Sequence, residues 1–347
     1  MILAIESSCD ESAIALLDPK LGFYGEWIHS QIELHSEYGG VVPDLATREH
    51  LTHFPNLLRA VKKKLANLIP SAIAVTQGPG LAGCLAMGIS TAKSLASYYK
   101  IPLIPINHLQ AHAFSPFIFC FEKNPPHFKD SFSNYFPHLG LVISGGNTLL
   151  FEITKNLQIT ILAETVDDAA GEAIDKGAKL LGLPYPGGPQ MEKLSLDGNP
   201  REYSFPRAFS SPQDMKFSFS GLKTSLRYLI EKMDDDQLNS SINSICASYQ
   251  KAVVDQIIRK TKQVLITKNY SSIGLSGGVA NNTLLRESLT NLGKNSRTPV
   301  YLAKKSHTGD NAGMIAFAAY LANLKKGCEL KNSETMEISF KPNWRLS

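Results

Sequence analysis

The chain lacks the features that mark membrane, secreted and strongly nucleic-acid-binding proteins. No apolar run approaches the roughly 20 residues that span a bilayer. Net charge is only +4, from 35 basic and 31 acidic residues, which is too small to indicate nucleic-acid binding by itself. Cysteines are few and no two of them form a Cys-x-x-Cys pair, so we expect reduced thiols rather than a disulfide framework. The five cysteines are Cys9, Cys84, Cys120, Cys246 and Cys328.

What is present indicates a globular protein with a sizeable core. Apolar residues make up 43% and charged residues 19% of the 347 residues, and this length allows two domains. The first residues, 1–6, contain no basic stretch and reach Glu6 early, so we expect a strand there and not a signal peptide. Together with the reduced thiols, this predicts a cytoplasmic protein.

Apolar segments alternate with segments of helical periodicity, which predicts an α/β architecture. Strand, polar turn and strand follow one another at residues 2–17 and again at 139–153. The repetition indicates a duplicated, two-lobed fold. Residues 120–137 carry three prolines and no clear periodicity, and we expect a connecting loop there. The predicted domains are therefore an N-terminal lobe, a C-terminal lobe and a C-terminal tail, covering residues 1–133, 134–324 and 325–347.

Two histidines have the spacing of a metal site. Asn107 ends an apolar run and is a good helix N-cap, so His108 and His112 are expected on one face of the helix that follows. Two such imidazoles can bind one metal ion. Nine histidines in this chain give about 0.2 pairs at this spacing by chance, and the Glu of the metalloprotease pattern His-Glu-x-x-His is missing. Asp310 either caps the helix expected from Asn311 or supplies a third ligand, and both roles stay open.

Three other segments combine polar residues with turns. Residues 6–12 crowd three acids into one turn, which is either a polar lip of a site or a solvated turn. Residues 144–148 (Ser-Gly-Gly-Asn-Thr) can cradle an anion or simply close a hairpin. Residues 166–182 are expected to form a helix with Asp168, Glu172 and Asp175 on one face, where a cation, a hydroxylated ligand or Lys179 would relieve their repulsion.

Taken together, these segments resemble the universal tRNA threonylcarbamoyladenosine transferases, once described as O-sialoglycoprotein endopeptidases. The resemblance covers nearly the whole chain, and so many ordered matches are more specific than any single one. Its landmarks are residues 5–11, 38–43, 78–81, the two histidines, 144–146, 167–173, 185–189, 217–224 and 310–311. The chain departs from the family pattern at Asn147, where histidine is usual. It also departs at residues 280–282, which read Ala-Asn-Asn where Ser-Ala-Asn is frequent, so that either Asn281 or Asn282 is the candidate ligand contact.

The resemblance implies a fold and a set of site residues. The fold is the two-lobed actin, Hsp70 and sugar-kinase fold, with a duplicated core and a nucleotide cleft between the lobes. The resemblance implies one divalent metal, iron with zinc as the alternative, bound by His108, His112 and Asp310. It further implies substrate contacts by Val142, Ile143, Ser144, Gly145, Gly146, Asp175, Gly188 and Asn282. Asp10 or Glu11 is a candidate catalytic base, since a carboxylate can accept the proton of an amine.

The resemblance also implies the reaction and the partners. The threonylcarbamoyl group of threonylcarbamoyl-AMP would pass to the exocyclic amine of an adenosine beside the anticodon of tRNAs that read ANN codons, and AMP would leave. The implied partners are tRNA, a paralogous actin-like subunit that forms a heterodimer, a small P-loop ATPase and the synthase that makes the adenylate. Lys62, Lys63, Lys64, Lys216, Lys223 and Arg227 are candidate phosphate contacts, and a solvated basic face is the simpler interpretation of the first three.

Two other classes of protein are compatible with parts of the sequence. A metalloprotease would explain the histidine pair, yet no Glu follows His108 to act as the general base. A sugar kinase or an Hsp70-like ATPase would share the fold, but these proteins usually have Gly in the first phosphate turn, where this chain has residues 7–9 (Ser-Ser-Cys). The product formed from ATP, threonine, bicarbonate and tRNA would distinguish these classes from the transferase.

Overall fold

The computed structural model describes residues 1–211, 213–326 and 337–346. They form two compact units, the first from Met1–Ser133 with Ala303–Leu346 and the second from Asn134–Leu302. Cys328 and the part of the expected tail at residues 327–336 lie outside the described residues. Within the described part of the chain, no helix is both long and apolar enough to cross a bilayer.

The first unit is built on a five-stranded sheet of order β3-β2-β1-β4-β5. Its strands are β1 (Ile2–Glu6), β2 (Glu11–Asp18), β3 (Gly22–Ser30), β4 (Ala72–Gly78) and β5 (Leu103–Asn107). β1 pairs antiparallel with β2 and parallel with β4, and β3 is an edge strand. The residues of β1 are all buried because helices cover both faces of the sheet, whereas exposed and half-buried residues alternate along β3.

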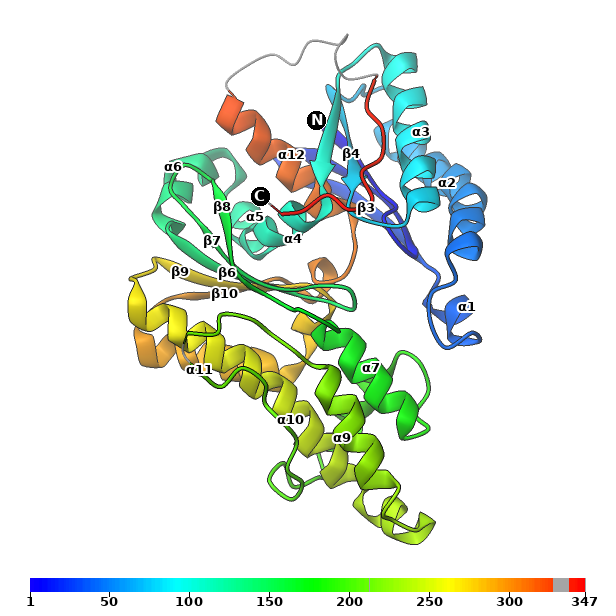
Figure 1. Ribbon diagram of the computed structural model, residues 1–347. Helices are drawn as coiled ribbons and strands as arrows, with labels where there is room; N and C mark the ends of the chain where they lie inside the picture. The colour runs from blue at the N-terminus through cyan, green and yellow to red at the C-terminus, as the bar shows by residue number, and fades with distance from the viewer. Residues whose placement is uncertain (212, 327–336, 347) are drawn as a thin grey trace. The chain divides into compact units, whose positions relative to one another are not determined.

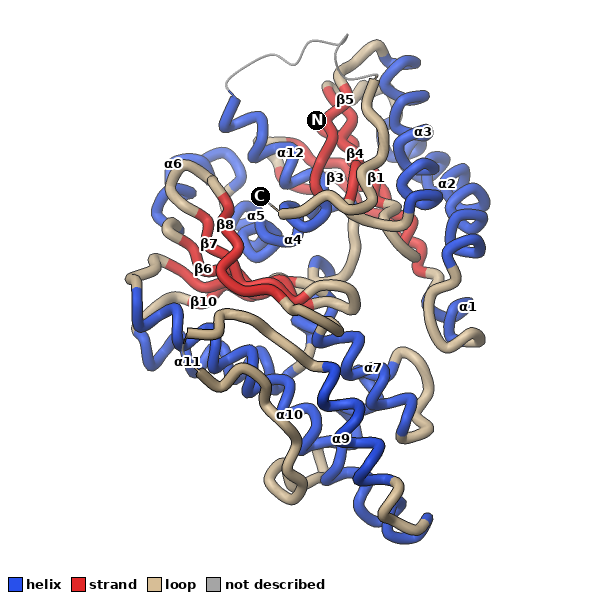
Figure 2. The backbone as a smooth tube through the Cα atoms, in the orientation of Figure 1, coloured by secondary structure: helices blue, strands red, loops and turns tan. Residues whose placement is uncertain are grey.

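Helices flank this sheet on two sides (Figures 1 and 2). α2 and α3 cover one face, where Leu3 and Ile5 of β1 meet Phe54 and Val61 of α2 and Ile89 of α3. α12 packs on β1 and β2 from the other face and contacts α4. The helices of this unit are α1 (Ile32–Ser36), α2 (Pro43–Leu65), α3 (Ala82–Tyr99), α4 (His108–Phe114), α5 (Ile118–Lys123), α6 (Phe128–Phe132) and α12 (Ala312–Lys326), with short 3₁₀ turns at Ser115–Phe117, Pro125–His127 and Lys305–His307.

The second unit has a five-stranded sheet of order β10-β9-β6-β7-β8. Leu139, Leu141 and Ile143 of β6 form its core with residues of the long helix α10, among them Tyr249 and Val253. A capping box of Asp234 and Gln237 fixes the start of α10. The elements are β6 (His138–Ile143), β7 (Thr148–Ile153), β8 (Ile159–Glu164), α7 (Ala170–Leu180), α8 (Gly187–Ser195), α9 (Ser220–Ile230), α10 (Asp235–Thr267), β9 (Ser272–Ser276), α11 (Thr283–Ser296) and β10 (Val300–Leu302), with 3₁₀ turns at Ser133–Tyr135 and Gly278–Asn281.

The two sheets have the same topology. In each unit three consecutive strands form an antiparallel meander. A fourth strand then pairs in parallel with the first strand of that meander, and a fifth pairs in parallel with the fourth. β1 and β6 therefore occupy equivalent central positions. The strand-turn-strand repetition in the sequence corresponds to the β1–β2 and β6–β7 hairpins.

The boundary after the second sheet differs from the expected one. We expected residues 134–324 to form one lobe, but residues from Ala303 onward belong to the first unit. The reason is the packing of α12, whose apolar residues Met314, Ile315 and Phe317 are fully buried. This helix completes the core of the first unit although it follows the second unit in sequence.

The expected loop at residues 120–137 was also wrong in part, because this stretch contains α6 and short 3₁₀ turns and begins within α5. Its aromatic residues turn inward: Phe121 and Phe128 are buried, with ring centroids 5.4 and 5.7 Å from Phe317 of α12. Burial of these rings stabilises helices that are too short to be stable alone.

Candidate metal centre and substrate-binding residues

The two predicted histidine ligands lie on one short helix. α4 begins at His108 because Asn107 caps it, with the Asn107 Oδ1 accepting a hydrogen bond from the Gln110 N–H at 3.0 Å. His108 and His112 are one turn apart, so both rings project from the same face, with centroids 4.7 Å apart. Both side chains are buried.

Asp310 reaches the same point from far along the sequence. Its Oδ1 lies 3.0 Å from His112 Nε2 and 3.3 Å from His108 Nε2. Asp310 does not cap the following helix. That role belongs to Asn311, whose Oδ1 accepts a hydrogen bond from the Met314 N–H at 2.8 Å. The carboxylate of Asp310 is therefore directed at the two imidazoles.

These three side chains have the donor set and the spacing that a divalent metal requires. Their ligand atoms all lie within 4.8 Å of one another. Two imidazole nitrogens and one carboxylate oxygen suit iron or zinc, and they leave further coordination positions open. Both Nε2 atoms converge on one oxygen, so a cation placed among them would contact all three ligands. The residues fit a metal.

Glu6, which the sequence placed only in the polar turn at residues 6–12, orients His108. Its carboxylate is completely buried at the end of β1, and its Oε2 lies 3.2 Å from His108 Nδ1. The Ser8 N–H donates to Glu6 Oε1 at 2.5 Å, and the Thr76 hydroxyl donates to Oε2. A carboxylate bonded to the second ring nitrogen fixes the tautomer that leaves Nε2 for a metal. The signal in the sequence was a lone acid at the end of an apolar strand.

Electrostatics in this cluster separate the two histidines. Burial opposes the charged form of each group, but the charges of Asp310 and Glu6 outweigh it and raise the pKa of His108 well above its ordinary value. Burial dominates at His112 and lowers its pKa, assisted by the charge of His108. Despite burial, His108 and the hydrogen bonds from both rings hold the pKa of Asp310 far below its ordinary value. A charged His108 thus occupies the place of a cation between two carboxylates.

The two candidate bases, Asp10 and Glu11, lie at the turn that enters β2. The backbone oxygen of Asp10 accepts a hydrogen bond from the Gln31 N–H at 3.0 Å, and the Ser30 hydroxyl donates to Glu11 Oε1 at 3.2 Å. Burial, followed by the charges of Asp310 and Asp10, raises the pKa of Glu11 well above its ordinary value. The ionised carboxylate of Glu11 is therefore a stronger base than that of an ordinary glutamate in water.

In the second unit, the predicted anion-binding turn joins β6 to β7. Val142 and Ile143 are buried in β6, while Gly145 and Gly146 are exposed at the turn. The Ser144 N–H donates to the Asn147 oxygen at 2.8 Å, which closes the hairpin. A Cβ on either glycine would meet nothing within 4 Å, so space for a ligand exists beside this backbone.

Asp175 and Gly188 are brought together. Asp175 Oδ1 accepts hydrogen bonds from the Gly187 N–H at 3.0 Å and the Gly188 N–H at 3.1 Å. The carboxylate thus binds the N-terminus of α8, where a negative charge is favoured. Burial nevertheless raises the pKa of Asp175.

Asn282 serves the start of another helix. Its Oδ1 accepts a hydrogen bond from the Leu285 N–H at 3.0 Å and caps α11, and its Nδ2 donates to Gln250 Oε1 at 2.8 Å. Asn282 is buried, whereas Asn281 is exposed in the preceding 3₁₀ turn. The two candidate asparagines therefore differ in environment: Asn282 is a buried helix cap and Asn281 faces solvent.

The expected acidic face on the helix after residue 166 is wrong. α7 begins only at Ala170, so Asp168 lies before it. Lys176, not Lys179, relieves the charges: its Nζ lies 2.6 Å from Asp168 and 2.9 Å from Glu172. Helical periodicity in the sequence thus overestimated the length of this helix. Asp168 and Glu172 contact Lys176, whereas Asp175 contacts the backbone at the start of α8.

The spacing Gly-x-Gly-x-x-Gly at residues 78–83 occurs between β4 and α3, the setting of a dinucleotide-binding turn. Here the chain itself fills the space. A Cβ on Gly78 would lie 1.9 Å from the Lys341 oxygen, and one on Gly80 would lie 2.5 Å from the Ser8 oxygen. The glycines therefore permit close approach of other backbone segments, and this turn does not have the room that a pyrophosphate needs.

Residues 274–278 match the spacing Gly-x-Ser-x-Gly of a nucleophile elbow. Ser276 is the last residue of β9 and is completely buried, and Gly277 follows with a φ of +93°. A nucleophilic serine must be exposed at the top of its turn. Ser276 does not meet that requirement.

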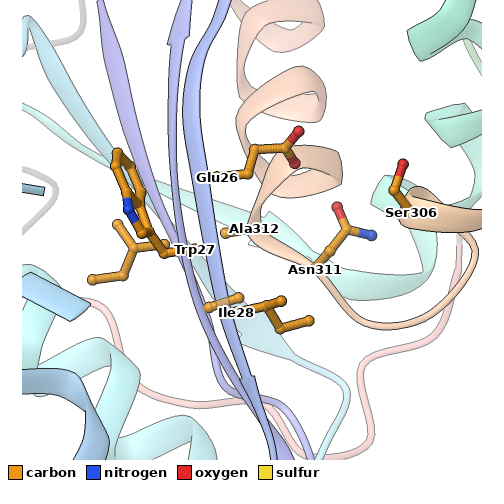
Figure 3. Close-up of a pocket in the computed structure, with 8 residues that line it drawn as sticks. Glu26, Trp27, Ile28, Ser306, Asn311 and Ala312 are labelled. Carbon is orange, nitrogen blue, oxygen red and sulfur yellow. The ribbon is translucent and has the colours of Figure 1, made fainter. Parts of the chain in front are cut away.

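A small cavity of 130 Å³ lies between β2, β3 and the start of α12 (Figure 3). Its lining residues are Ala13, Ile14, Glu26, Trp27, Ile28, Ser306, Asn311 and Ala312. None of His108, His112 and Asp310 lines it, so this cavity is separate from the metal centre. Among the lining residues, Glu26 places its Oε2 3.0 Å from His307 Nε2.

Comparison with known families identifies the chain. The sequence model of the TsaD family, tRNA N6-adenosine threonylcarbamoyltransferase, matches residues 23–317. The chain belongs to this family. The match includes His108, His112 and Asp310, and the family consists of transferases that modify tRNA.

Solved structures support the fold. A full-length HypF in the phosphate- and nucleotide-bound form is 15% identical with a TM-score of 0.60, and the match covers 95% of this chain and 47% of that one. T. kodakarensis HypF gives 15% identity, a TM-score of 0.63 and coverage of 96% and 49%. The chain thus spans about half the length of both. The activator of the 2-hydroxyisocaproyl-CoA dehydratase from Clostridium difficile, with bound ADPNP, is 16% identical with a TM-score of 0.51. The match covers 95% of this chain and 97% of that one. The expected two-lobed, actin-like α/β fold is confirmed.

Proposed function

We propose that the chain transfers the threonylcarbamoyl group of threonylcarbamoyl-AMP to the exocyclic amine of an adenosine next to the anticodon in tRNAs that read ANN codons. A carbon–nitrogen bond forms, the bond between the carbamoyl carbon and the phosphate oxygen breaks, AMP leaves and the amine loses a proton. The observation that carries the proposal is the convergence of His108 and His112 on Asp310 in a chain of this family.

In this proposal the first unit holds the metal, iron or alternatively zinc. His108, His112 and Asp310 are its ligands, and Glu6 keeps His108 in the required tautomer. A metal so bound would supply Lewis-acid polarisation of a carbonyl or phosphate oxygen. Glu11, or Asp10 beside it, accepts the proton of the amine. The raised pKa of Glu11 supports this role, because it makes the carboxylate a better base.

The second unit supplies substrate contacts. The exposed amides of Gly145 and Gly146 are proposed to stabilise negative charge on the tetrahedral intermediate. Val142 and Ile143 at the end of β6, together with Ser144 at the start of the turn, are proposed to hold the substrate near its reactive centre. Asp175, Gly188 and Asn282 are proposed to contact the nucleoside.

The proposal includes several partners. Lys216, Lys223 and Arg227 are exposed and are proposed to contact tRNA phosphates. The modest net charge suggests that a paralogous actin-like subunit and a P-loop ATPase supply part of the tRNA surface. A separate synthase would provide the adenylate. Because its substrate is tRNA, the protein is proposed to act in the cytoplasm.

The test is a reconstituted assay with ATP, threonine, bicarbonate, ANN-decoding tRNA and the partner proteins, with the nucleosides analysed by mass spectrometry. We expect modified adenosine with the native chain and a loss of at least 100-fold with His108→Ala/His112→Ala, since one transition-state contact of this kind contributes about that factor. His127→Ala, a change of an exposed histidine, is the matched control.

Other products would identify another function. Unmodified tRNA together with ADP and a phosphorylated sugar would support a kinase, and peptide cleavage would support a metalloprotease. Full activity of the double variant with no bound metal would remove the metal centre from the mechanism.

A further inference from the structure

A second group of potential metal ligands lies in the first unit, on elements that do not contribute to the first site. His29 is in β3, and Glu49 and His53 are on α2. One ligand atom from each of the three lies within 4.8 Å of the others. His53 Nε2 is 3.0 Å from Glu49 Oε2. The rings of His29 and His53 are stacked, with centroids 3.3 Å apart and an angle of 17° between their planes.

The fold places these residues together for identifiable reasons. Glu49 and His53 are four residues apart and therefore share one face of α2. Along β3, side chains alternate between the two faces of the sheet, and Figure 3 shows Trp27 on the opposite side of the strand from Glu26. Trp27 packs against the core between the sheet and α2, and His29 projects from β3 to the same side.

The chemistry of the group favours a cation over a simple stack of rings. Two imidazoles in face-to-face contact repel each other if both are protonated, whereas a cation bound in the plane of two neutral rings avoids this repulsion. Neutral rings offer lone pairs to a metal. Glu49 adds one negative charge, and the set of two nitrogens and one oxygen resembles that of three-ligand zinc sites.

The group is also accessible to ions. The side chains of His53 and Glu49 are 24% and 25% exposed, so a hydrated ion can enter and retain a water ligand. By contrast, His127 and Asp130 form an exposed pair that has no third ligand within reach among the described residues. This pair provides a matched control.

We propose that His29, Glu49 and His53 form a second metal site, which binds a borderline divalent cation of the Zn²⁺ class through three protein ligands and solvent. The bound ion would join the edge strand β3 to α2. This inference does not depend on the proposed function, because it uses none of the residues assigned to transfer.

The test is a titration of metal-free, full-length chain with Zn²⁺ against a chromophoric chelator. We expect about two equivalents for the native chain and about one for His53→Phe, which keeps an aromatic ring for stacking but removes the ligand nitrogen. His127→Phe should bind as the native chain does. His108→Ala/His112→Ala should retain about one equivalent, and combining it with His53→Phe should abolish binding.

A second variant keeps the proposal testable if His53→Phe does not fold. Glu49→Gln preserves size and removes the charge, and we expect at least a tenfold weaker Zn²⁺ affinity at this site. The same stoichiometry and affinity in the native chain, His53→Phe and Glu49→Gln would overturn the proposal. So would a complete loss of Zn²⁺ binding in His108→Ala/His112→Ala.

Discussion

At the level of single residues, the contact between Glu6 and His108 orients one ligand of the proposed metal centre. Glu6 is completely buried, and its carboxylate is held by the Ser8 amide and the Thr76 hydroxyl. Because the acid is fixed, it can hold His108 in one orientation and one tautomer. A carboxylate buried this deeply is costly unless a partner compensates its charge, and His108 is that partner.

We predict that Glu6→Gln weakens metal binding. Glutamine keeps the volume but cannot accept as strongly from His108 Nδ1, and loss of such a partner typically costs 10- to 100-fold in metal affinity, so we expect a decrease of about that size. Competition with a chelator measures it. Glu33→Gln, an exposed change on α1, should leave the affinity unchanged. An affinity equal to that of the native chain for Glu6→Gln would contradict the orienting role.

Metal binding should also release protons. Despite burial, the charges of Asp310 and Glu6 raise the pKa of His108 and so favour the protonated ring in the metal-free chain. A ligand nitrogen must lose its proton, so we expect release of about one proton per metal at pH 7 and an affinity that rises about tenfold per pH unit until the pH passes the raised pKa of His108. Calorimetry in buffers of different ionisation enthalpy counts these protons. Metal binding without proton release at pH 7 would contradict the assignment of charge to His108.

The same ring affects the stability of the metal-free chain. A pKa raised above the unfolded value stabilises the folded state while the group is protonated in it. This contribution is complete below about pH 6.5, the ordinary pKa of histidine, and it is lost as the pH rises through the raised value. The metal-free chain should therefore lose stability from this group at alkaline pH, and the metal-bound chain should not.

Several site residues could be foreseen from the sequence, and others could not. Asn107 and the histidine spacing are local patterns, so the helix start and the shared face followed from them. The position of Asp310 beside both rings depends on packing of distant segments, which no local pattern encodes. Glu6 was missed for the same reason: its partner is 102 residues away.

At the scale of elements, the last described segment contacts the start of α4, the helix that carries both proposed histidine ligands. Residues 337–346 run along the end of β4 and reach Asn107. The Lys341 N–H donates to the Gln77 oxygen at 2.7 Å, and the Gly80 N–H donates to the Pro342 oxygen at 3.1 Å. Asn107, which caps α4, donates from its Nδ2 to the Arg345 oxygen at 3.0 Å. The segment thus fixes the orientation of Asn107, the cap that starts α4.

Deleting residues 337–347 should therefore destabilise the protein and weaken metal binding. Each lost hydrogen bond contributes about 1 kcal/mol. Losing the burial of the Leu346 side chain costs roughly 1.5–3 kcal/mol more. Urea unfolding and chelator competition measure the two effects. Arg345→Ala is the control, because the exposed side chain is removed while the backbone oxygen stays. An unchanged unfolding midpoint for the deletion would show that this segment is dispensable.

Element boundaries show where propensity and packing disagree. The start of α12 beyond Asp310 was close to the expected one, because the segment is apolar along most of its length and Asn311 caps it. α7 is shorter than expected because Thr165 and Asp168 hold a turn before it, with the Thr165 hydroxyl donating to the Asp168 oxygen at 2.7 Å. The helices α5 and α6 were missed because they are stabilised by burial of aromatic rings against α12 and not by their own sequence.

At the scale of the whole molecule, the two units differ in how the chain builds them. The second unit is formed by one segment of the sequence, Asn134–Leu302, and has its own sheet and core. The first unit needs a return of the chain, because α12 covers β1 and β2. Removing α12 would expose one face of that sheet to water.

We therefore predict different behaviour for the separated parts. Residues 134–302 alone should unfold cooperatively in urea, since a continuous segment with its own core can fold by itself. Residues 1–133 alone should aggregate or bind a hydrophobic dye, because the apolar surface under α12 is uncovered. Joining residues 303–346 to residue 133 through a short Gly/Ser linker is the control and should restore cooperative unfolding. Cooperative unfolding of 1–133 by itself would contradict the need for α12.

The sequence by itself determined the class of fold, the repeated strand-turn-strand units, the helix that starts at Asn107 and the histidine pair, because all of these follow from local periodicity, capping and spacing. Only the tertiary structure decided that α12 belongs with the first sheet, that Asp310 and Glu6 meet His108, and that His29 stacks on His53. Those contacts join residues far apart in the chain, and their partners are selected by the burial of apolar surface over the whole unit.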